Sequence, residues 1–205
     1  MKKRVNGLFI VLEGIDGSGK SKISELLAAN LKKQRRNILL THEPWKSKYG
    51  KQIRKLVRSK EGKNIRKVEW LKLFDADRQE HINKEILPAL RKGKIVLCDR
   101  YYYSTLAYQL SAREWKEYSS RIKVKPDIVF IFDLPVSLSL KRASARDKKD
   151  GRKTAVFEKR VFLENVRKKF LMIPRVLEDN IKVIDSKTSV KKVFQTVKKE
   201  VEKVL

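Results

Sequence analysis

The residues best suited to chemistry form one short segment near the start of the chain. Residues 14–21 read Gly-Ile-Asp-Gly-Ser-Gly-Lys-Ser and match the phosphate-binding pattern G-x-x-x-x-G-K-[ST] at every fixed position. An apolar run of strand length, residues 8–12, precedes the segment, and apolar residues recur at helical spacing from Ile23 to Leu31 after it. Because the pattern binds nucleoside phosphates when it joins a strand to a helix, we predict a nucleotide-binding loop rather than a plain glycine-rich turn.

Each residue type in this segment has a use in binding a nucleoside triphosphate. The glycines allow a tight turn, and the helix that begins at Lys20 adds unpaired backbone N–H groups for phosphate oxygens. We expect Lys20 to be a solvent-facing cation for the β- and γ-phosphates, and the Ser21 hydroxyl to be a ligand for Mg²⁺. The predicted ATP-binding residues here are Gly14, Asp16, Gly17, Ser18, Gly19, Lys20, Ser21 and Lys22.

The chain carries a large positive charge. Its 205 residues include 51 Lys and Arg against 24 Asp and Glu, which gives a formal net charge of +27. Such a field attracts polyanions, including nucleotides, nucleic acids and anionic membrane surfaces. The lysines are scattered and form no stripe with aromatic residues of the kind that single-strand-binding proteins use. We expect only non-specific attraction of nucleic acid, and a basic nucleic-acid-binding ATPase stays open as the rival from another class.

Sequence features that bear on compartment point to the cytoplasm. The apolar run after Met1–Arg4 is too short for a signal peptide and ends at Glu13, and no stretch reaches membrane-spanning length. The single cysteine, Cys98, excludes an internal disulfide and fits a reducing compartment. Since it lies in the apolar run 95–98, we expect a buried, inert thiol rather than a nucleophile.

Short apolar runs alternate with helical patterns along the whole chain. This alternation predicts a five-stranded parallel sheet with helices on both faces, in one domain spanning residues 1–205. Ligands of such sheets bind outside the carboxyl ends of the strands, where His42-Glu43-Pro44 and Asp99-Arg100 fall. The predicted strands are 8–12, 37–41, 95–98, 128–132 and 181–185, and the main predicted helices after the first are 65–90, 101–110, 112–122, 135–145, 157–177 and 190–204, with one short helix between 46 and 64.

Two segments resemble a specific enzyme family. Residues 99–109 resemble the D-R-Y-x-x-S-x-x-A-Y-Q signature of thymidylate kinases, and residues 73–78 resemble the L-F-x-A-x-R helix of the same family. The phosphate loop, residues 127–134 and Lys141-Arg142-Ala143 resemble the family in the expected order, so the resemblance covers nearly the whole chain. It implies a three-layer P-loop kinase fold with a short lid, transfer of phosphate from ATP to dTMP with Mg²⁺, and a homodimer.

The resemblance also implies roles for individual residues. Arg100 would bind the acceptor phosphate, and Asp99 would hold a magnesium-bound water. Phe74 would stack on the base and Arg78, one turn later, would bind its edge, although an ordinary core position stays open for Phe74 and a surface salt bridge for Arg100. The acceptor site so implied contains Asp16 (binding the sugar 3′-OH), Glu43, Pro44, Phe74, Arg78, Arg100, Ser104, Thr105, Tyr108 and Gln109.

A charged run, residues 145–154, corresponds to the family's lid. Some thymidylate kinases carry a catalytic arginine inside the phosphate loop, where this chain has Gly17, so the chain resembles the class whose arginine comes from the lid. Arg146 and Arg152 are the candidates, with Arg142 at the lid's base as part of the ATP site. Together with Lys20, Asp99 and Arg100 they form the predicted catalytic set. For each lid arginine the alternative stays open that it is only a solvent-exposed surface charge.

The chain departs from the family pattern at a few positions. Lys22 replaces a second hydroxyl after Ser21, and no arginine follows Glu43-Pro44, where Lys46 could supply the cation. These departures concern substrate preference, so a broader deoxynucleoside- or nucleoside-monophosphate kinase stays open beside thymidylate kinase, as does a non-catalytic nucleotide-binding relative. His42 and His81 lack metal-ligand spacing, and no structural metal is expected.

Overall fold

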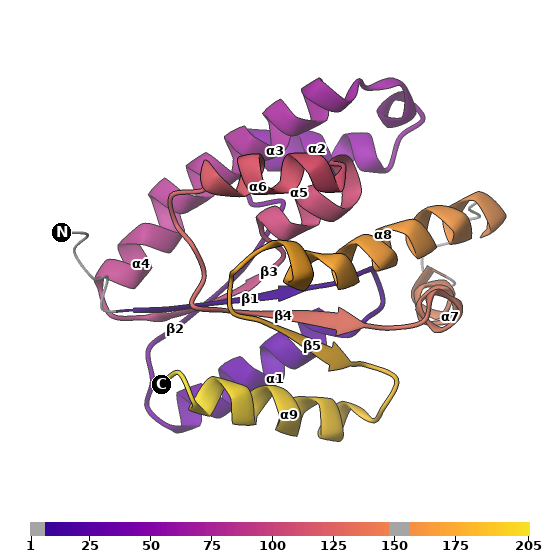
Figure 1. Ribbon diagram of the computed structural model, residues 1–205. Helices are drawn as coiled ribbons and strands as arrows, with labels where there is room; N and C mark the ends of the chain where they lie inside the picture. Colours follow the sequence, from indigo (N-terminus) through magenta and orange to yellow (C-terminus); the bar gives the residue numbers. More distant parts are fainter. Residues whose placement is uncertain (1–6, 148–155) are drawn as a thin grey trace.

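The computed structural model describes residues 7–147 and 156–205. Within these ranges the strands form one parallel five-stranded sheet of order β2-β3-β1-β4-β5 (Figure 1). This confirms the predicted fold class, and every predicted strand is present. The strands are β1 (Leu8–Glu13), β2 (Ile38–His42), β3 (Ile95–Asp99), β4 (Ile128–Asp133) and β5 (Ile181–Asp185).

Helices cover both faces of this sheet (Figure 1). Side chains alternate along β1, so Phe9 and Val11 join one hydrophobic core while Ile10 and Leu12 join the other. The second core is closed by α1 (Lys20–Lys33) and α9 (Val190–Glu202). Helices on the opposite side include α2 (Lys48–Val57), the short 3₁₀ helix η1 (Glu61–Asn64), α3 (Lys67–His81), α5 (Tyr102–Gln109), α6 (Ala112–Ser120) and α8 (Val156–Val176). None of the helices in this described part of the chain is long and apolar enough to cross a bilayer.

The helix predicted over residues 65–90 contains a wider turn. After α3 the chain forms the π-helical turn η2 (Ile82–Ile86) before α4 (Leu87–Arg91). Pro88 explains the change, because it lacks the N–H that an α-helix would bond to the carbonyl of Lys84, and its ring crowds that carbonyl.

The element before the predicted lid is longer than expected. Helix α7 spans Val136–Asp147, so the first residues of the charged run 145–154 are helical rather than loop. Residues 148–154, including Arg152, lie outside the described residues, and the side chain of Arg146 is not described either. Three strands also extend by one residue each, so the carboxylates of Glu13, Asp99 and Asp133 end β1, β3 and β4.

Candidate nucleotide-binding and phosphoryl-transfer site

The loop between β1 and α1 turns sharply at glycines. Gly14 has a φ of 137° and Gly17 a φ of 79°, and a Cβ atom on Gly17 would lie 2.9 Å from the carbonyl oxygen of Ser139. Helix α7 supports the loop from this side, because Ser139 Oγ donates to the Asp16 carbonyl at 2.6 Å and Arg142 Nη1 donates to the Gly17 carbonyl at 3.3 Å. A larger side chain at position 17 would therefore strain the loop and separate it from α7.

Lys20 is buried, not solvent-facing as its sequence context suggested. Its side chain is 5% exposed, and Nζ donates to the carbonyl oxygens of Gly14 and Ile15 at 3.0 Å each. Burial, with the nearby positive charge of Arg100, lowers the pKa of Lys20 to about 8. The loop thus wraps around the ammonium group of Lys20, which can exchange two neutral carbonyl acceptors for anionic phosphate oxygens.

The predicted Mg²⁺ ligands lie together although 78 residues separate them in sequence. Ser21 Oγ at the start of α1 donates to Asp99 Oδ2 at the end of β3, at 2.5 Å. The other carboxylate oxygen, Asp99 Oδ1, is buried and has no hydrogen-bond partner among the described residues. Such an oxygen needs a cation or a donor, so this hydroxyl–carboxylate pair fits Mg²⁺, which usually takes few protein ligands and completes its shell with water and phosphate.

A cavity of about 410 Å³ opens beside the loop. Most of the predicted ATP-binding residues line it, whereas Gly14 and Ser18 do not, and Val190 at the start of α9 was not predicted. Ser18 is buried, and its N–H donates to the Ile15 carbonyl within the loop at 3.3 Å. The lining residues are Asp16, Gly17, Gly19, Lys20, Ser21, Lys22, Asp99, Arg100, Arg142 and Val190.

A second cavity, of about 240 Å³, lies next to the first, and all of the predicted acceptor-site residues line it. Three further residues, Ile53, Val57 and Tyr101, complete its wall. Ile53 and Val57 belong to no recognised motif, and their spacing of four on α2 was the only signal for them in the sequence. The lining residues are Asp16, Glu43, Pro44, Ile53, Val57, Phe74, Arg78, Arg100, Tyr101, Ser104, Thr105, Tyr108 and Gln109.

Arg100 stands between the two cavities. Its φ of 75° is in the left-handed region, which is rare for a side chain with a Cβ atom and is a feature of functional sites. Its guanidinium donates to Asp16 Oδ1 at 2.5 Å and to Ser104 Oγ at 3.0 Å. Asp16 and Arg100 line both cavities, so a group bound to either side chain lies at the boundary between the cavities.

A buried glutamate that sequence reasoning missed supports this boundary. Glu13, the last residue of β1, accepts from the Tyr101 N–H and from Ser104 Oγ, each at 2.7 Å. Burial raises the pKa of Glu13 to about 7, against the opposing effect of the Arg100 charge. Glu13 therefore ties the strand before the phosphate loop to the turn that carries Arg100.

The far end of the second cavity carries the residues expected to bind a base and a sugar. Phe74 is only partly buried, lies outside the hydrophobic cores and has its ring 5.8 Å from that of Trp70. The Tyr108 hydroxyl is buried without a hydrogen-bond partner in the described residues, and burial raises its pKa to about 12. A flat ring in the wall and an unsatisfied hydroxyl suit a planar, polar ligand.

Lys46, Cys98 and the acidic, histidine and cysteine side chains were also considered from the sequence, and the structure places them as follows. Lys46 lines neither of these cavities; its Nζ binds Glu85 Oε1 at 2.9 Å instead. Cys98 is buried, with Sγ donating to the Arg100 carbonyl at 3.0 Å, and burial raises its pKa well above the usual value, which agrees with an inert thiol. No group of three or more His, Cys, Asp or Glu side chains could hold a metal ion in the part of the chain that the structure covers.

A parallel sheet that places a phosphate-binding loop at the end of β1, beside a second cavity lined by Arg78 and Arg100, defines the class of P-loop nucleotide kinases. The profile of one such family, thymidylate kinase, matches residues 12–197. Probable thymidylate kinases from Pyrococcus abyssi and Thermococcus kodakarensis are 38% and 41% identical to the chain, over 94% and 93% of its length and 95% of theirs. The crystal structure of thymidylate kinase from Ehrlichia chaffeensis matches with a TM-score of 0.71 and 30% identity, over 95% of this chain and 98% of that one. The chain belongs to the thymidylate kinase family and is a phosphotransferase.

Proposed function

We propose that the chain transfers the γ-phosphoryl group of ATP to dTMP, giving dTDP for dTTP synthesis. The observation that carries this proposal is the pair of adjoining cavities that share Asp16 and Arg100. A donor triphosphate on the phosphate loop and an acceptor monophosphate on Arg100 would meet at this boundary. Family membership supplies the identity of the acceptor.

The first cavity is proposed as the ATP site. Backbone N–H groups of the loop and Lys20 would bind the β- and γ-phosphates, and Arg142 would border the site from α7. Ser21 and Asp99 would hold Mg²⁺, which when bound with ATP neutralises phosphate charge. The buried, unpartnered Asp99 Oδ1 supports this assignment.

The second cavity is proposed as the dTMP site. Arg100 would bind the acceptor phosphate in place of one of its present partners, Asp16 would accept from the sugar 3′-OH, and Phe74 would stack on thymine. Arg78 is already engaged by Glu43, Thr105, Tyr118 and, at 3.5 Å, by Asp75. Asp75 and Tyr118, the partners of Nη1, line a different cavity, whereas Thr105, the partner of Nη2, lines this one. Nη2 would therefore be the donor to O4 of the base.

No general base is required for this reaction, since the acceptor phosphate is already anionic. The rate would come from alignment of the two phosphates and from neutralisation of charge by Lys20, Arg100 and a lid arginine, for which Arg146 and Arg152 are proposed. We also propose that residues 1–205 act as one domain with a lid at about 145–154, as a cytoplasmic homodimer that binds nucleic acid only non-specifically.

The test is a coupled ATP assay with the purified chain and each common nucleoside and deoxynucleoside monophosphate. We expect the order dTMP, then dUMP, with UMP and dCMP far behind, because cytosine presents a donor where thymine presents O4. Comparable kcat/KM for dTMP and dCMP would instead favour the broader monophosphate kinase. Stimulation of ATP hydrolysis by DNA, without transfer to any monophosphate, would favour the nucleic-acid-binding ATPase.

A further inference from the structure

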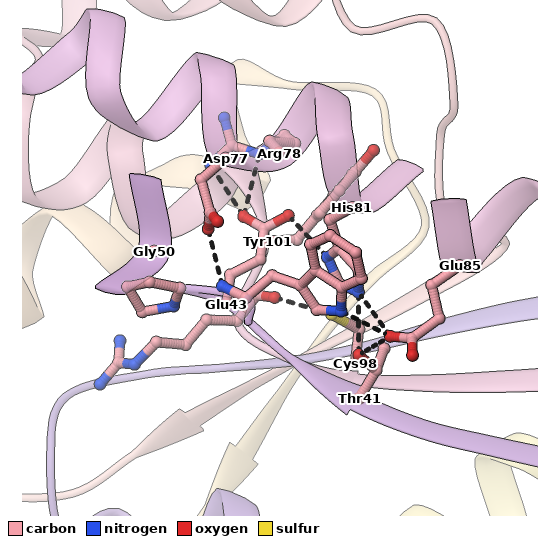
Figure 2. Close-up of polar contacts among 12 residues, drawn as sticks. Thr41, Glu43, Gly50, Asp77, Arg78, His81, Glu85, Cys98 and Tyr101 are labelled. Carbon is pink, nitrogen blue, oxygen red and sulfur yellow. Dashed lines mark hydrogen bonds and ion pairs between the residues drawn. The ribbon is translucent and has the colours of Figure 1, made fainter. Parts of the chain in front are cut away.

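A chain of polar side chains runs from Glu43, in the wall of the acceptor cavity, to the partly buried Glu85 (Figure 2). We call it the Glu43–Glu85 chain; it consists of Glu43, His81, Thr41 and Glu85. Glu43 Oε1 lies 3.3 Å from His81 Nδ1, His81 Nε2 lies 2.8 Å from Thr41 Oγ1, and Thr41 Oγ1 lies 2.7 Å from Glu85 Oε2. The imidazole of His81 is fully buried, so it has no water to complete its hydrogen bonds.

Counting protons along the Glu43–Glu85 chain decides its charge state. Each of its three contacts needs one proton between the two heavy atoms. Glu43 is paired with Arg78 and Glu85 with Lys46, so both are counted as carboxylates that supply no proton. The Thr41 hydroxyl supplies one, and a neutral imidazole supplies one more, so either neutral tautomer of His81 leaves a contact without a proton. An imidazolium donates from both ring nitrogens and completes all three contacts.

The surrounding charges are consistent with this count. Glu43 and Glu85 both lie within 3.4 Å of the imidazole, one on each side. Arg78 on α3 reaches the ring only through Glu43, and Lys46 in the loop after β2 binds the outer oxygen of Glu85. The Trp45 ring stacks on His81, with 5.3 Å between the ring centroids. Asp77, which precedes Arg78 in sequence, accepts a hydrogen bond from the Trp45 backbone N–H at 2.7 Å. Cys98 on β3 is turned to the Arg100 carbonyl.

The same glutamate contacts the wall of the acceptor cavity. Glu43 Oε2 accepts from Arg78 Nε and lies 3.0 Å from Arg78 Nη2. Arg78 is 3% exposed, and its guanidinium also donates to Thr105 and Tyr118. A buried guanidinium keeps its orientation only while its acceptors keep theirs, and Glu43 is held on its other oxygen by His81 alone among the described side chains.

We propose that His81 is a positioning residue, held as an imidazolium between Glu43 and Glu85, which fixes Glu43 against Arg78 and thereby sets the base-recognition wall of the acceptor cavity. The link to base recognition rests on the proposed function. The charge state of His81 does not, so the two parts can fail separately.

The charge state can be measured on the unaltered protein. The chain has only two histidines, His42 and His81, so a ¹⁵N-labelled sample gives two sets of ring signals, and H42Q assigns them. His42 ends β2 with an exposed side chain and serves as the internal reference. We expect His81 to show both ring nitrogens protonated at neutral pH. A single protonated nitrogen, with the other bearing a lone pair, would overturn the proposal.

The positioning role is tested by H81Q with H42Q as its matched control. Loss of the contact to Glu43 should raise KM for dTMP about tenfold, the effect of leaving one buried polar group unsatisfied, while kcat changes little. The ratio of kcat/KM for dTMP to that for dCMP should fall, which general loosening of the fold would not cause. A folded H81Q with unchanged KM and unchanged ratio would overturn the positioning role. If H81Q does not fold, the ring signals of the unaltered protein still test the charge state of His81. A wild-type protein that is inactive on dTMP would refute the proposed function and leave the charge state of His81 untouched.

Discussion

Arg100 Nη2 lies 2.5 Å from Asp16 Oδ1, and these two side chains belong to the walls of both cavities. The pair joins the turn after β3 to the phosphate loop after β1 across 84 residues of sequence. A phosphate that binds Arg100 must compete with Asp16 for guanidinium N–H groups. Acceptor binding is therefore expected to release Asp16 toward the sugar, which couples the two parts of the acceptor site.

Replacing Arg100 by Lys keeps the charge and removes the planar, two-pronged donor. We expect kcat/KM for dTMP to fall at least a hundredfold, the order found when a charge partner of the transition state is lost. R121K, on the exposed end of α6, is the control and should be near normal. An R100K enzyme within threefold of wild type would show that bidentate binding is not needed.

Lys20→Ala is expected to abolish phosphoryl transfer, with at least a hundredfold loss of kcat. Because Lys20 is buried and holds the loop through the carbonyls of Gly14 and Ile15, some loss of stability should accompany the change. Steady-state kinetics and thermal unfolding of K20A, with K33A at the exposed end of α1 as control, separate the two effects. Near-normal kcat in a folded K20A would refute the phosphate-loop assignment.

For the lid, at least one of Arg146→Ala and Arg152→Ala should lower kcat tenfold or more while KM for dTMP changes little. This is the pattern for an interaction made mainly in the transition state. We would measure kcat and KM for dTMP in both single variants, the double variant and R142A, with R121A as the control. If the double variant turns over normally, the transition-state arginine must be sought elsewhere, with Arg142 first.

Tyr108 is expected to select against ribose. Its partly buried ring packs against Phe170 at 6.1 Å and against Phe162 at 6.0 Å between centroids, which leaves little freedom to move away from a 2′-OH. Tyr108→Ala should therefore lower the ratio of kcat/KM for dUMP to kcat/KM for UMP by roughly tenfold. This corresponds to removing a penalty of about 1–3 kcal/mol on binding the ribose 2′-OH. Tyr103→Ala, whose hydroxyl donates to Asp179 and which lines neither cavity, controls for loss of a buried tyrosine. An unchanged ratio would place sugar selection on other residues.

Glu13 gives a prediction about pH. Its pKa is raised from 4.5 to about 7 in the folded chain, so between these values the folded state binds more protons than the unfolded state. The contribution of Glu13 to the free energy of unfolding must then decrease as pH rises through this window. Urea unfolding of wild type and E13Q should show wild type losing stability relative to E13Q between pH 5 and pH 8, whereas the exposed E25Q should show no such trend. A wild type that gains stability relative to E13Q over this range would contradict the assignment.

Local patterns predicted much of this protein. The strand–loop–helix around Gly14–Ser21 and the alternation of apolar runs depend on spacing along the chain, so the parallel sheet and the phosphate loop could be read directly. The family signatures then named the residues that line the acceptor cavity. The predictions of the parallel sheet and of the strand–loop–helix succeeded because their physical basis, periodic burial and backbone freedom at glycine, is local.

The tertiary structure decided which side chains meet. Glu13 supports the Arg100 turn, Lys46 binds Glu85 rather than facing a cavity, and Lys20 is enclosed by its own loop. His81 belonged to no motif, yet it lies between Glu85, one helical turn later, and Glu43, which is 38 residues away in sequence. Such contacts depend on how the loop after β2 and the α3–η2 helix pack over the sheet. The periodicity of a sequence fixes which face of an element is buried, whereas the partner that each buried polar group finds is set only when those faces come together.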